Sequence, residues 1–227
     1  MSNSTQLALQ VGLRDESTLE NFFPRVSLQA LLSTMASPLE EPLSFLHGPT
    51  EVGKSHLLQA LCLAQANAIY LPMEQLHELP GQGVFESLEN APLVAIDDLQ
   101  CLAGDPDWEE SLFHFVNRAR ASGCALWMAA DKPPLALPLD LPDLQSRLAG
   151  GMVWAVGECT DDELADILSF RAKRRGLDLQ SAAATYLCRR ESRTLSSLLD
   201  TLDRLDEASL RFQRPVSVPF IKEVMGW

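Results

Sequence analysis

Residues 48–55 read Gly-Pro-Thr-Glu-Val-Gly-Lys-Ser, and this stretch decides the fold. Its spacing, Gly followed by four residues and then Gly-Lys-Ser, is that of a phosphate-binding loop between a strand and a helix. Glycines at Gly48 and Gly53 let backbone N–H groups curl around a phosphate without a Cβ clash. Lys54 supplies a positive charge, and Ser55, at the start of the predicted helix, offers a hydroxyl to Mg²⁺. We therefore expect a bound nucleoside di- or triphosphate.

The rest of this loop is predicted to contact the same nucleotide. The additional expected contacts are Pro49, Thr50, Glu51, Val52 and His56. His56 is included because of its position in the sequence. The four histidines show no metal-ligand spacing with one another, so we expect them to be structural.

A second motif, Leu93–Ile96 followed by Asp97 and Asp98, complements the loop. An apolar strand that ends in acidic residues is the pattern of a Walker B motif. Asp97 is expected to hold Mg²⁺ through water, and Asp98 to orient the attacking water. Such a strand is common in α/β proteins, so the motif alone is a weak signal. Together with the phosphate-binding loop it indicates a nucleotide site.

Composition restricts the class of protein. The chain has 227 residues, 46% of them hydrophobic, which suits one α/β domain with a small appendage. The formal net charge of −13 argues against a broad DNA-coating surface. Five scattered cysteines without C-x-x-C spacing predict neither a zinc site nor disulfides and favour a reducing cytoplasm. We see no signal peptide and no apolar run long enough to span a membrane.

Five short apolar runs alternate with helix-like stretches up to about residue 157, which predicts βαβ units around a parallel sheet. The runs are Leu43–His47, Ala68–Leu71, Leu93–Ile96, Ala125–Ala129 and Met152–Val156. We expect an N-terminal extended segment over residues 1–15, a nucleotide-binding α/β domain over 16–157 and a helical lid domain over 158–227. The carboxyl ends of the strands should carry the ligand.

Beyond residue 157 the pattern is purely helical. The capping box Thr160-Asp161-Asp162-Glu163 begins a helix that Gly176 is placed to end. Further helices are predicted over 181–190, over 193–212 and from Ser217. The helix over 193–212 carries a leucine stripe that we expect to be core. The basic run of residues 171–175 is interpreted mainly as cations that favour a helix C-terminus.

This order, a phosphate-binding domain followed by a helical lid, resembles the AAA+ ATPases, and the motifs resemble their DnaA family. Residues 93–100, LVAIDDLQ, look like that family's Walker B segment. The run DLQSRL at 143–148 resembles its box VII, which implies that Arg147 is an arginine finger acting in a neighbouring protomer. The run AADKPP at 129–134 resembles sensor 1, which implies a role for Asp131 near the γ-phosphate. Arg193 falls at the sensor 2 position.

Two features narrow the resemblance to the Hda branch of that family. The sequence ends at Trp227, after the predicted lid, whereas the initiator carries a further DNA-binding domain, so we expect no direct sequence-specific DNA binding. The stretch 6–11 resembles peptides that dock on the bacterial β sliding clamp, although its Gln-Val ending departs from the usual apolar pair. The implied clamp contacts are Gln6, Leu7, Leu9 and Val11. The stretch 17–24 looks like the segment that lines the adenine pocket, which implies contacts from Asn21 and Phe22.

The resemblance implies a cytoplasmic adaptor that binds ADP or ATP with Mg²⁺ and docks on the DNA-loaded clamp, the DNA polymerase III β subunit. It would stimulate ATP hydrolysis by DnaA and so negatively regulate replication initiation, with weak intrinsic ATPase activity or none. One alternative is an autonomous ATPase of the helicase-loader type that acts with single-stranded DNA or a helicase. Another is a nucleotide-dependent tether without a role in hydrolysis. The identity of the resting nucleotide stays open. So does the oligomeric state, which includes a homodimer or a higher oligomer.

Overall fold

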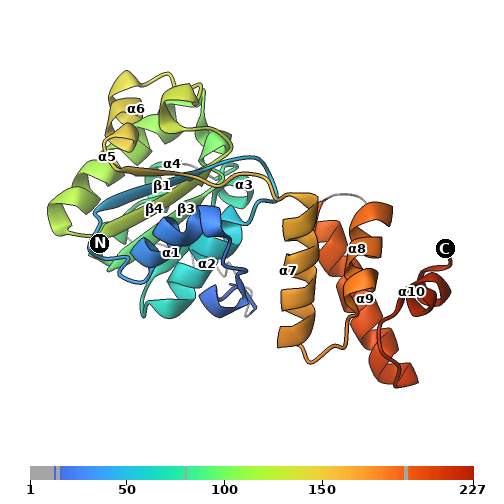
Figure 1. Ribbon diagram of the computed structural model, residues 1–227. Coiled ribbons are helices and arrows are strands. Elements are labelled where there is room, and N and C mark those ends of the chain that lie inside the picture. Colours follow the sequence, from blue (N-terminus) through green and yellow to red (C-terminus); the bar gives the residue numbers. More distant parts are fainter. Residues whose placement is uncertain (1–12, 14–15, 80, 192–193) are drawn as a thin grey trace.

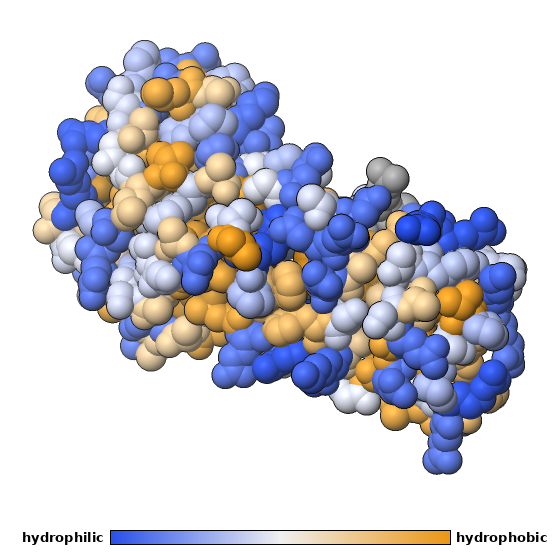
Figure 2. Space-filling model, in the orientation of Figure 1, coloured by the Kyte–Doolittle hydropathy of each residue, from blue (hydrophilic) through white to orange (hydrophobic). Residues whose placement is uncertain are grey.

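The protein has an α/β part and a separate helical part, arranged as an elongated, two-lobed molecule (Figures 1 and 2). The computed structural model describes residue 13 and residues 16–79, 81–191 and 194–227. Within this described portion, no helix is both long and apolar enough to cross a membrane.

A five-stranded parallel sheet forms the centre of the α/β part, in the order β2-β3-β4-β1-β5. The strands are β1 Leu43–His47, β2 Ile69–Pro72, β3 Leu93–Asp97, β4 Ala125–Ala130 and β5 Met152–Ala155. All five predicted strands are confirmed, with ends that shift by one residue at most. Because the sheet is parallel, the segments that follow β1, β3 and β4 all leave it at the same edge.

Helices cover both faces of this sheet, which makes a three-layer sandwich (Figure 1). The helices of this part are α1 Gln29–Met35, α2 Lys54–Ala64, α3 Met73–Leu76, α4 Gly81–Val84, α5 Pro106–Ser122 and α6 Pro142–Ala149. Short 3₁₀ turns occur at Leu19–Asn21, Val26–Leu28, Leu88–Asn90, Leu99–Leu102 and Pro134–Ala136.

The apolar sequences of the strands fit a sheet that is buried on both faces. All six residues of β4 are buried; Trp127 packs in the cluster formed with α1 and α2, and Met128 in the cluster formed with α5 and α6. Successive side chains of a strand point to opposite faces, so an uninterrupted apolar run is what a sheet between two helix layers requires.

The helical part consists of α7 Asp161–Arg174, α8 Ser181–Arg190, α9 Leu195–Phe212 and α10 Val218–Met225. The predicted capping box is confirmed, since Thr160 Oγ1 accepts from the Glu163 amide and the Glu163 carboxylate accepts from the Thr160 amide. Gly176 has φ +73° two residues after α7, as a helix-ending glycine does. Leu198, Leu202 and Leu205 are fully buried, so the leucine stripe is core.

We predict that Leu202→Ala lowers the free energy of unfolding of the helical part by about 2–5 kcal/mol, because it leaves a cavity in a core that is closed to solvent. The matched control is Leu210→Ala on the same helix, where the leucine is 74% exposed and the change should stay within about 0.5 kcal/mol. Urea unfolding followed by circular dichroism compares the two. Equal losses would contradict this assignment of the core.

Candidate functional site

The phosphate-binding loop follows β1 and ends where α2 begins. Gly48 has φ +157°, and a Cβ on it would lie 2.0 Å from the carbonyl oxygen of Val156. Gly53 has φ +100°, and a Cβ there would lie 2.9 Å from the ring of Phe22. Gly48 is therefore required by the close approach of the Val156 backbone, and Gly53 by its positive φ and by the neighbouring Phe22 ring. The loop thus keeps its glycine backbone bare, as a phosphate cradle requires.

Lys54, the first residue of α2, is buried inside this cradle. Its ammonium donates hydrogen bonds to the carbonyl oxygens of Gly48 (2.8 Å) and Pro49 (2.6 Å). Burial lowers the pKa of Lys54, and the nearby carboxylates of Asp97, Asp98 and Asp131 partly offset that effect. A cation thus lies beside the loop, where it would attract an anion that the loop holds, while the three carboxylates favour its charged form.

Asp97, the last residue of β3, is 1% exposed. Its Oδ1 accepts a hydrogen bond from the Asp98 amide (3.0 Å), and its Oδ2 accepts one from the Tyr70 hydroxyl (2.8 Å). Burial raises the pKa of Asp97, and hydrogen bonds from Ser55, Tyr70 and the Asp98 amide oppose that rise. The structure brings Asp97 and Ser55 together, as a shared Mg²⁺ site would require.

Tyr70 is a part of the site that the sequence analysis missed. It lies on β2, next to β3, and its hydroxyl accepts a hydrogen bond from Gln59 Nε2 at 3.3 Å. Burial and the Asp97 charge raise the pKa of Tyr70 well above its usual value, so the phenol stays a donor. A polar-tipped tyrosine inside an otherwise apolar strand was the available signal.

Asp98 and Asp131 are joined through one side chain. Gln100 Nε2 donates to Asp98 Oδ1 at 3.0 Å, and Gln100 Oε1 accepts from the Asp131 amide at 3.2 Å. Asp98 has φ 54°, a left-handed conformation that turns the chain sharply at the end of β3. Asp131 Oδ1 is buried and has no hydrogen-bond partner among the described residues. The structure thus brings both acidic residues to the loop and adds Gln100, another residue that was missed.

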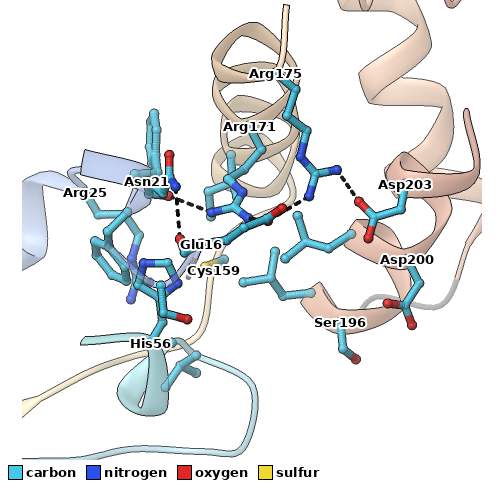
Figure 3. Close-up of a pocket in the computed structure, with 18 residues that line it drawn as sticks. Glu16, Asn21, Arg25, His56, Cys159, Arg171, Arg175, Ser196, Asp200 and Asp203 are labelled. Atoms are coloured by element: carbon cyan, nitrogen blue, oxygen red, sulfur yellow. Dashed lines mark hydrogen bonds and ion pairs between the residues drawn. The ribbon is translucent and has the colours of Figure 1, made fainter. Parts of the chain in front are cut away.

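A cavity of about 240 Å³ lies between the two parts of the molecule (Figure 3). Residues 16–25, which we call the leading segment, form one wall; the loop and His56 form another, and α7 and α9 close the third. Asn21 and Phe22 both line it, together with Val52 and Gly53. The positions expected to contact the base are therefore grouped beside the loop.

His56 joins the leading segment to α2. Its Nε2 lies 2.8 Å from the carbonyl oxygen of Thr18, so this nitrogen carries the proton. Its ring lies 5.5 Å from the ring of Phe22. Burial lowers the pKa of His56, and a neutral imidazole follows at physiological pH. The contact is structural, and it also places His56 in the cavity wall.

Arginines at the C-terminal end of α7, including Arg175 directly after it, hold the leading segment against the helical part. Arg171 donates to the Asn21 carbonyl oxygen (3.1 Å) and to Glu16 Oε2 (2.9 Å), and Arg175 donates to the same Glu16 oxygen at 3.1 Å (Figure 3). Arg174 donates to Asn21 Oδ1 (3.0 Å) and also pairs with Glu20. We call this set the arginine clasp.

The clasp shows a second role for the basic run of residues 171–175. Besides lying near the C-terminus of α7, its arginines bind the leading segment. Positions 171, 174 and 175 share one helix face, and this spacing was the available signal. Arg175 also pairs with Asp203 of α9, so the clasp ties the leading segment to two helices of the helical part. Arg25 adds a further link, since its Nη1 donates to the Gly157 carbonyl oxygen at 2.9 Å, just before α7.

The start of α9 touches the phosphate-binding loop, because the Ser196 hydroxyl donates to the Glu51 carboxylate. Thr50 lines a neighbouring hollow with Glu51 and Leu195. Arg193, the predicted sensor 2 residue, lies outside the described residues, as do Gln6, Leu7, Leu9 and Val11 of the predicted clamp peptide.

Arg147 lies far from this cavity in the fold. It is an exposed residue of α6 and lines a hollow with Leu43 and Met152, the first residues of β1 and β5. That hollow is therefore at the amino ends of the strands, whereas the phosphate-binding loop follows the carboxyl end of β1. The structure does not bring Arg147 to its own chain's loop.

Comparisons with known proteins agree with this architecture. Residues 161–225 match the family model described as the lid domain of Hda. An uncharacterized protein of Haemophilus influenzae is 37% identical over 228 residues, covering 97% of this chain and 98% of the relative. Two solved structures of DnaA have the same fold at lower sequence identity.

The first is the crystal structure of domain III of the Thermotoga maritima replication initiation protein DnaA. It gives a TM-score of 0.78 at 20% identity and covers 95% of this chain and 98% of that one. The second is AMPPCP-bound DnaA from Aquifex aeolicus, with a TM-score of 0.70 at 22% identity, covering 86% of this chain and 66% of that one.

We predict that ADP protects Cys159 from alkylation, because this half-buried thiol lines the cavity. Burial raises the pKa of Cys159, so labelling by N-ethylmaleimide should be slow and should speed up as the pH rises through the alkaline range. Saturating ADP should slow it about tenfold, as measured by mass spectrometry of digested peptides. Cys101, which does not line the cavity, is the internal control and at a given pH should label at the same rate with and without ADP. Equal labelling of Cys159 with and without ADP would contradict this site.

Proposed function

This chain belongs to the Hda family of DnaA-related AAA+ proteins, and on that basis we propose that it is an adaptor that activates ATP hydrolysis by DnaA. In this proposal it holds an adenine nucleotide in the cavity between its two parts. It acts together with the DNA-loaded β sliding clamp and so restrains the initiation of chromosome replication. Its own turnover of ATP is slow or absent.

The proposal of a bound ADP or ATP rests on the cradle geometry. Gly48 and Gly53 leave no space for a Cβ, Lys54 is buried beside the loop, and the cavity adjoins Gly53. Phosphate groups would bind to the loop amides, and the base would lie between Asn21, Phe22 and the start of α9. The Aquifex aeolicus DnaA structure carries AMPPCP, an ATP analogue, on the same fold.

Magnesium fits the acidic residues that face the loop. Asp97 is buried and accepts a hydrogen bond from Ser55, and Asp131, whose Oδ1 is unpartnered among the described residues, acts on the charge of Lys54. Ser55 and Asp97 would hold the ion, directly or through water, and the ion would neutralise charge on the phosphates. Gln100 would keep Asp98 and Asp131 in a fixed relation while the nucleotide is bound.

The single observation that carries the adaptor proposal is the position of Arg147. This exposed arginine lies at the amino ends of the strands, away from its own loop, and no described residue accepts a hydrogen bond from it. It is free to enter the nucleotide site of a neighbouring AAA+ protomer. Arginine fingers supplied in this way accelerate phosphoryl transfer by on the order of 10³ to 10⁵. Arg147 would stabilise charge that develops on the γ-phosphate of ATP bound by DnaA.

The nucleotide of this chain would then serve mainly to set the angle of its helical part. The Ser196 to Glu51 contact and the arginine clasp connect α7 and α9 to the loop and the leading segment. A ligand that binds all three walls stabilises one arrangement of the two parts. Arg193, at the sensor 2 position, would report the phosphate state from the same helical part.

The clamp contact is proposed for the peptide of residues 6–11. Gln6 would hydrogen-bond at the rim of a groove on the clamp while Leu7, Leu9 and Val11 enter it. The peptide precedes Glu16, which the clasp ties to α7. Docking on the clamp would therefore hold the AAA+ part near the DNA-bound partner.

One observation favours a second candidate function, an autonomous ATPase of the helicase-loader type. Asp98, Gln100 and Asp131 form a connected set beside the loop, which is the arrangement that water activation needs. Steady-state ATP hydrolysis stimulated by single-stranded DNA would support this candidate over the adaptor.

We predict that this protein, with DNA-loaded clamp present, speeds the single-turnover hydrolysis of ATP bound to DnaA, and that Arg147→Ala lowers the maximal rate at least about a hundredfold. The reason is the loss of a cation that acts in the transition state, so nucleotide and clamp binding should be unchanged. Conversion of labelled ATP to ADP is measured by rapid quench.

The same assay tests the clamp contact with a variant in which Gln6, Leu7 and Leu9 are changed to Ala. This variant should lose the dependence on the clamp and keep the intact Arg147 surface. Unchanged rates with the Arg147→Ala protein would refute the trans mechanism, and unchanged clamp dependence would refute the peptide contact.

A further inference from the structure

The hollow that contains Arg147 has a second arginine that none of the motifs above includes. Arg120, near the C-terminus of α5, lines the same hollow, which has a volume of about 260 Å³. Both arginines are exposed, and within the described part of the chain neither has a hydrogen-bond or ion-pair partner. The other charged residue of the lining, Glu41, forms no ion pair with either arginine.

This pairing of cations contrasts with the charge of the domain around it. Residues 1–157 contain 7 basic and 19 acidic residues. Among the other basic residues, Lys54 is buried in the loop, Arg25 is buried against Gly157, and Arg118 faces Glu89 at 3.3 Å. Two of the few cations of an acidic domain therefore occupy one hollow, and a cluster of this sign in a negative field selects for an anionic partner.

The shape of the hollow suits a compact anion. Its lining includes Gly150 and Gly151, which carry no side chains, and a Cβ on Gly151 would lie 2.5 Å from the Leu43 carbonyl oxygen. Leu126 and Val116 contribute apolar surface to the same wall, and both are buried. An apolar wall strengthens the interaction of nearby charges, because it excludes water from one side.

We propose that Arg120 is a second phosphate-binding residue of this surface, which holds the triphosphate of the ATP bound by DnaA while Arg147 acts on its γ-phosphate. This inference rests on the proposed function. A guanidinium offers five N–H donors in a rigid fork that matches phosphate oxygens. Two guanidinium groups can therefore bind different phosphates of one triphosphate. Arg120 contributes binding and Arg147 contributes transition-state stabilisation, so their kinetic signatures differ.

The experiment is single-turnover hydrolysis by ATP-bound DnaA on DNA-loaded clamp, with this protein as the titrated component. Arg120→Ala should raise its half-saturating concentration about tenfold and leave the maximal rate within about twofold, because a charged hydrogen bond is lost from binding. Arg147→Ala should instead lower the maximal rate. Arg120→Lys, which keeps the charge, should recover part of the affinity.

The matched control is Arg189→Ala, which removes an exposed arginine from α8 in the helical part and should change neither parameter. A merely structural role of Arg120 would lower thermal stability, so the melting temperature of Arg120→Ala is measured and should equal that of the native protein. A native half-saturating concentration for Arg120→Ala, or a loss that follows a lowered melting temperature, would overturn the proposal.

A second measurement keeps the result independent of DnaA. Tripolyphosphate is titrated into the protein, and the arginine Nε–H NMR signals are assigned with Arg120→Lys and Arg147→Lys. Joint shifts of both signals support the hollow as a phosphate site even if DnaA hydrolysis does not respond, an outcome that refutes only the adaptor function. The absence of any shift at Arg120 overturns the inference.

Discussion

The close contact between Gly48 and Val156 is the constraint on which the rest of the structure depends. The Val156 amide donates to the His47 carbonyl oxygen at 2.7 Å, and the Val156 carbonyl leaves no room for a side chain at position 48. The beginning of the phosphate-binding loop and the connection to α7 are therefore one packed unit. Arg25 extends this unit by bonding to Gly157. These contacts join the phosphate-binding loop to the segment that leads into the helical part.

Charged residues of opposite sign lie at opposite edges of the sheet. Acidic residues that face the loop follow β3 and β4 at the carboxyl edge of the sheet, whereas Arg120 and Arg147 lie at its amino edge. In the proposed complex with DnaA, the edge that carries Arg120 and Arg147 would face the nucleotide of the partner. The arginine clasp contributes little to the free energy of folding. Glu16 is 65% exposed, and exposed ion pairs contribute about 0–1 kcal/mol. Its role is to orient the leading segment.

Features that depend on neighbouring residues or on a regular repeat could be predicted from the sequence. The phosphate-binding spacing, the continuous apolar run of β3 and the Thr160 capping box depend on neighbouring residues, so each could be predicted together with its position. Tyr70, Gln100 and the clasp could not be predicted in the same way. Tyr70 reaches Asp97 across 27 positions, and Arg171 reaches Glu16 across 155, so these contacts depend on sheet order and on how the two parts meet. Arg147 and Arg120 come together only because α5 and α6 pack side by side.

The most direct test of the central claim is the effect of ADP on thermal stability, comparing the native protein with Lys54→Ala. A ligand that binds only the folded state raises the melting temperature in proportion to the logarithm of its concentration once sites are filled. We expect this rise for the native protein in the presence of Mg²⁺. Little or no rise is expected for Lys54→Ala, in which the buried cation of the loop is missing. A native melting temperature that does not respond to ADP, or an equal response in both proteins, would contradict a nucleotide bound at this loop.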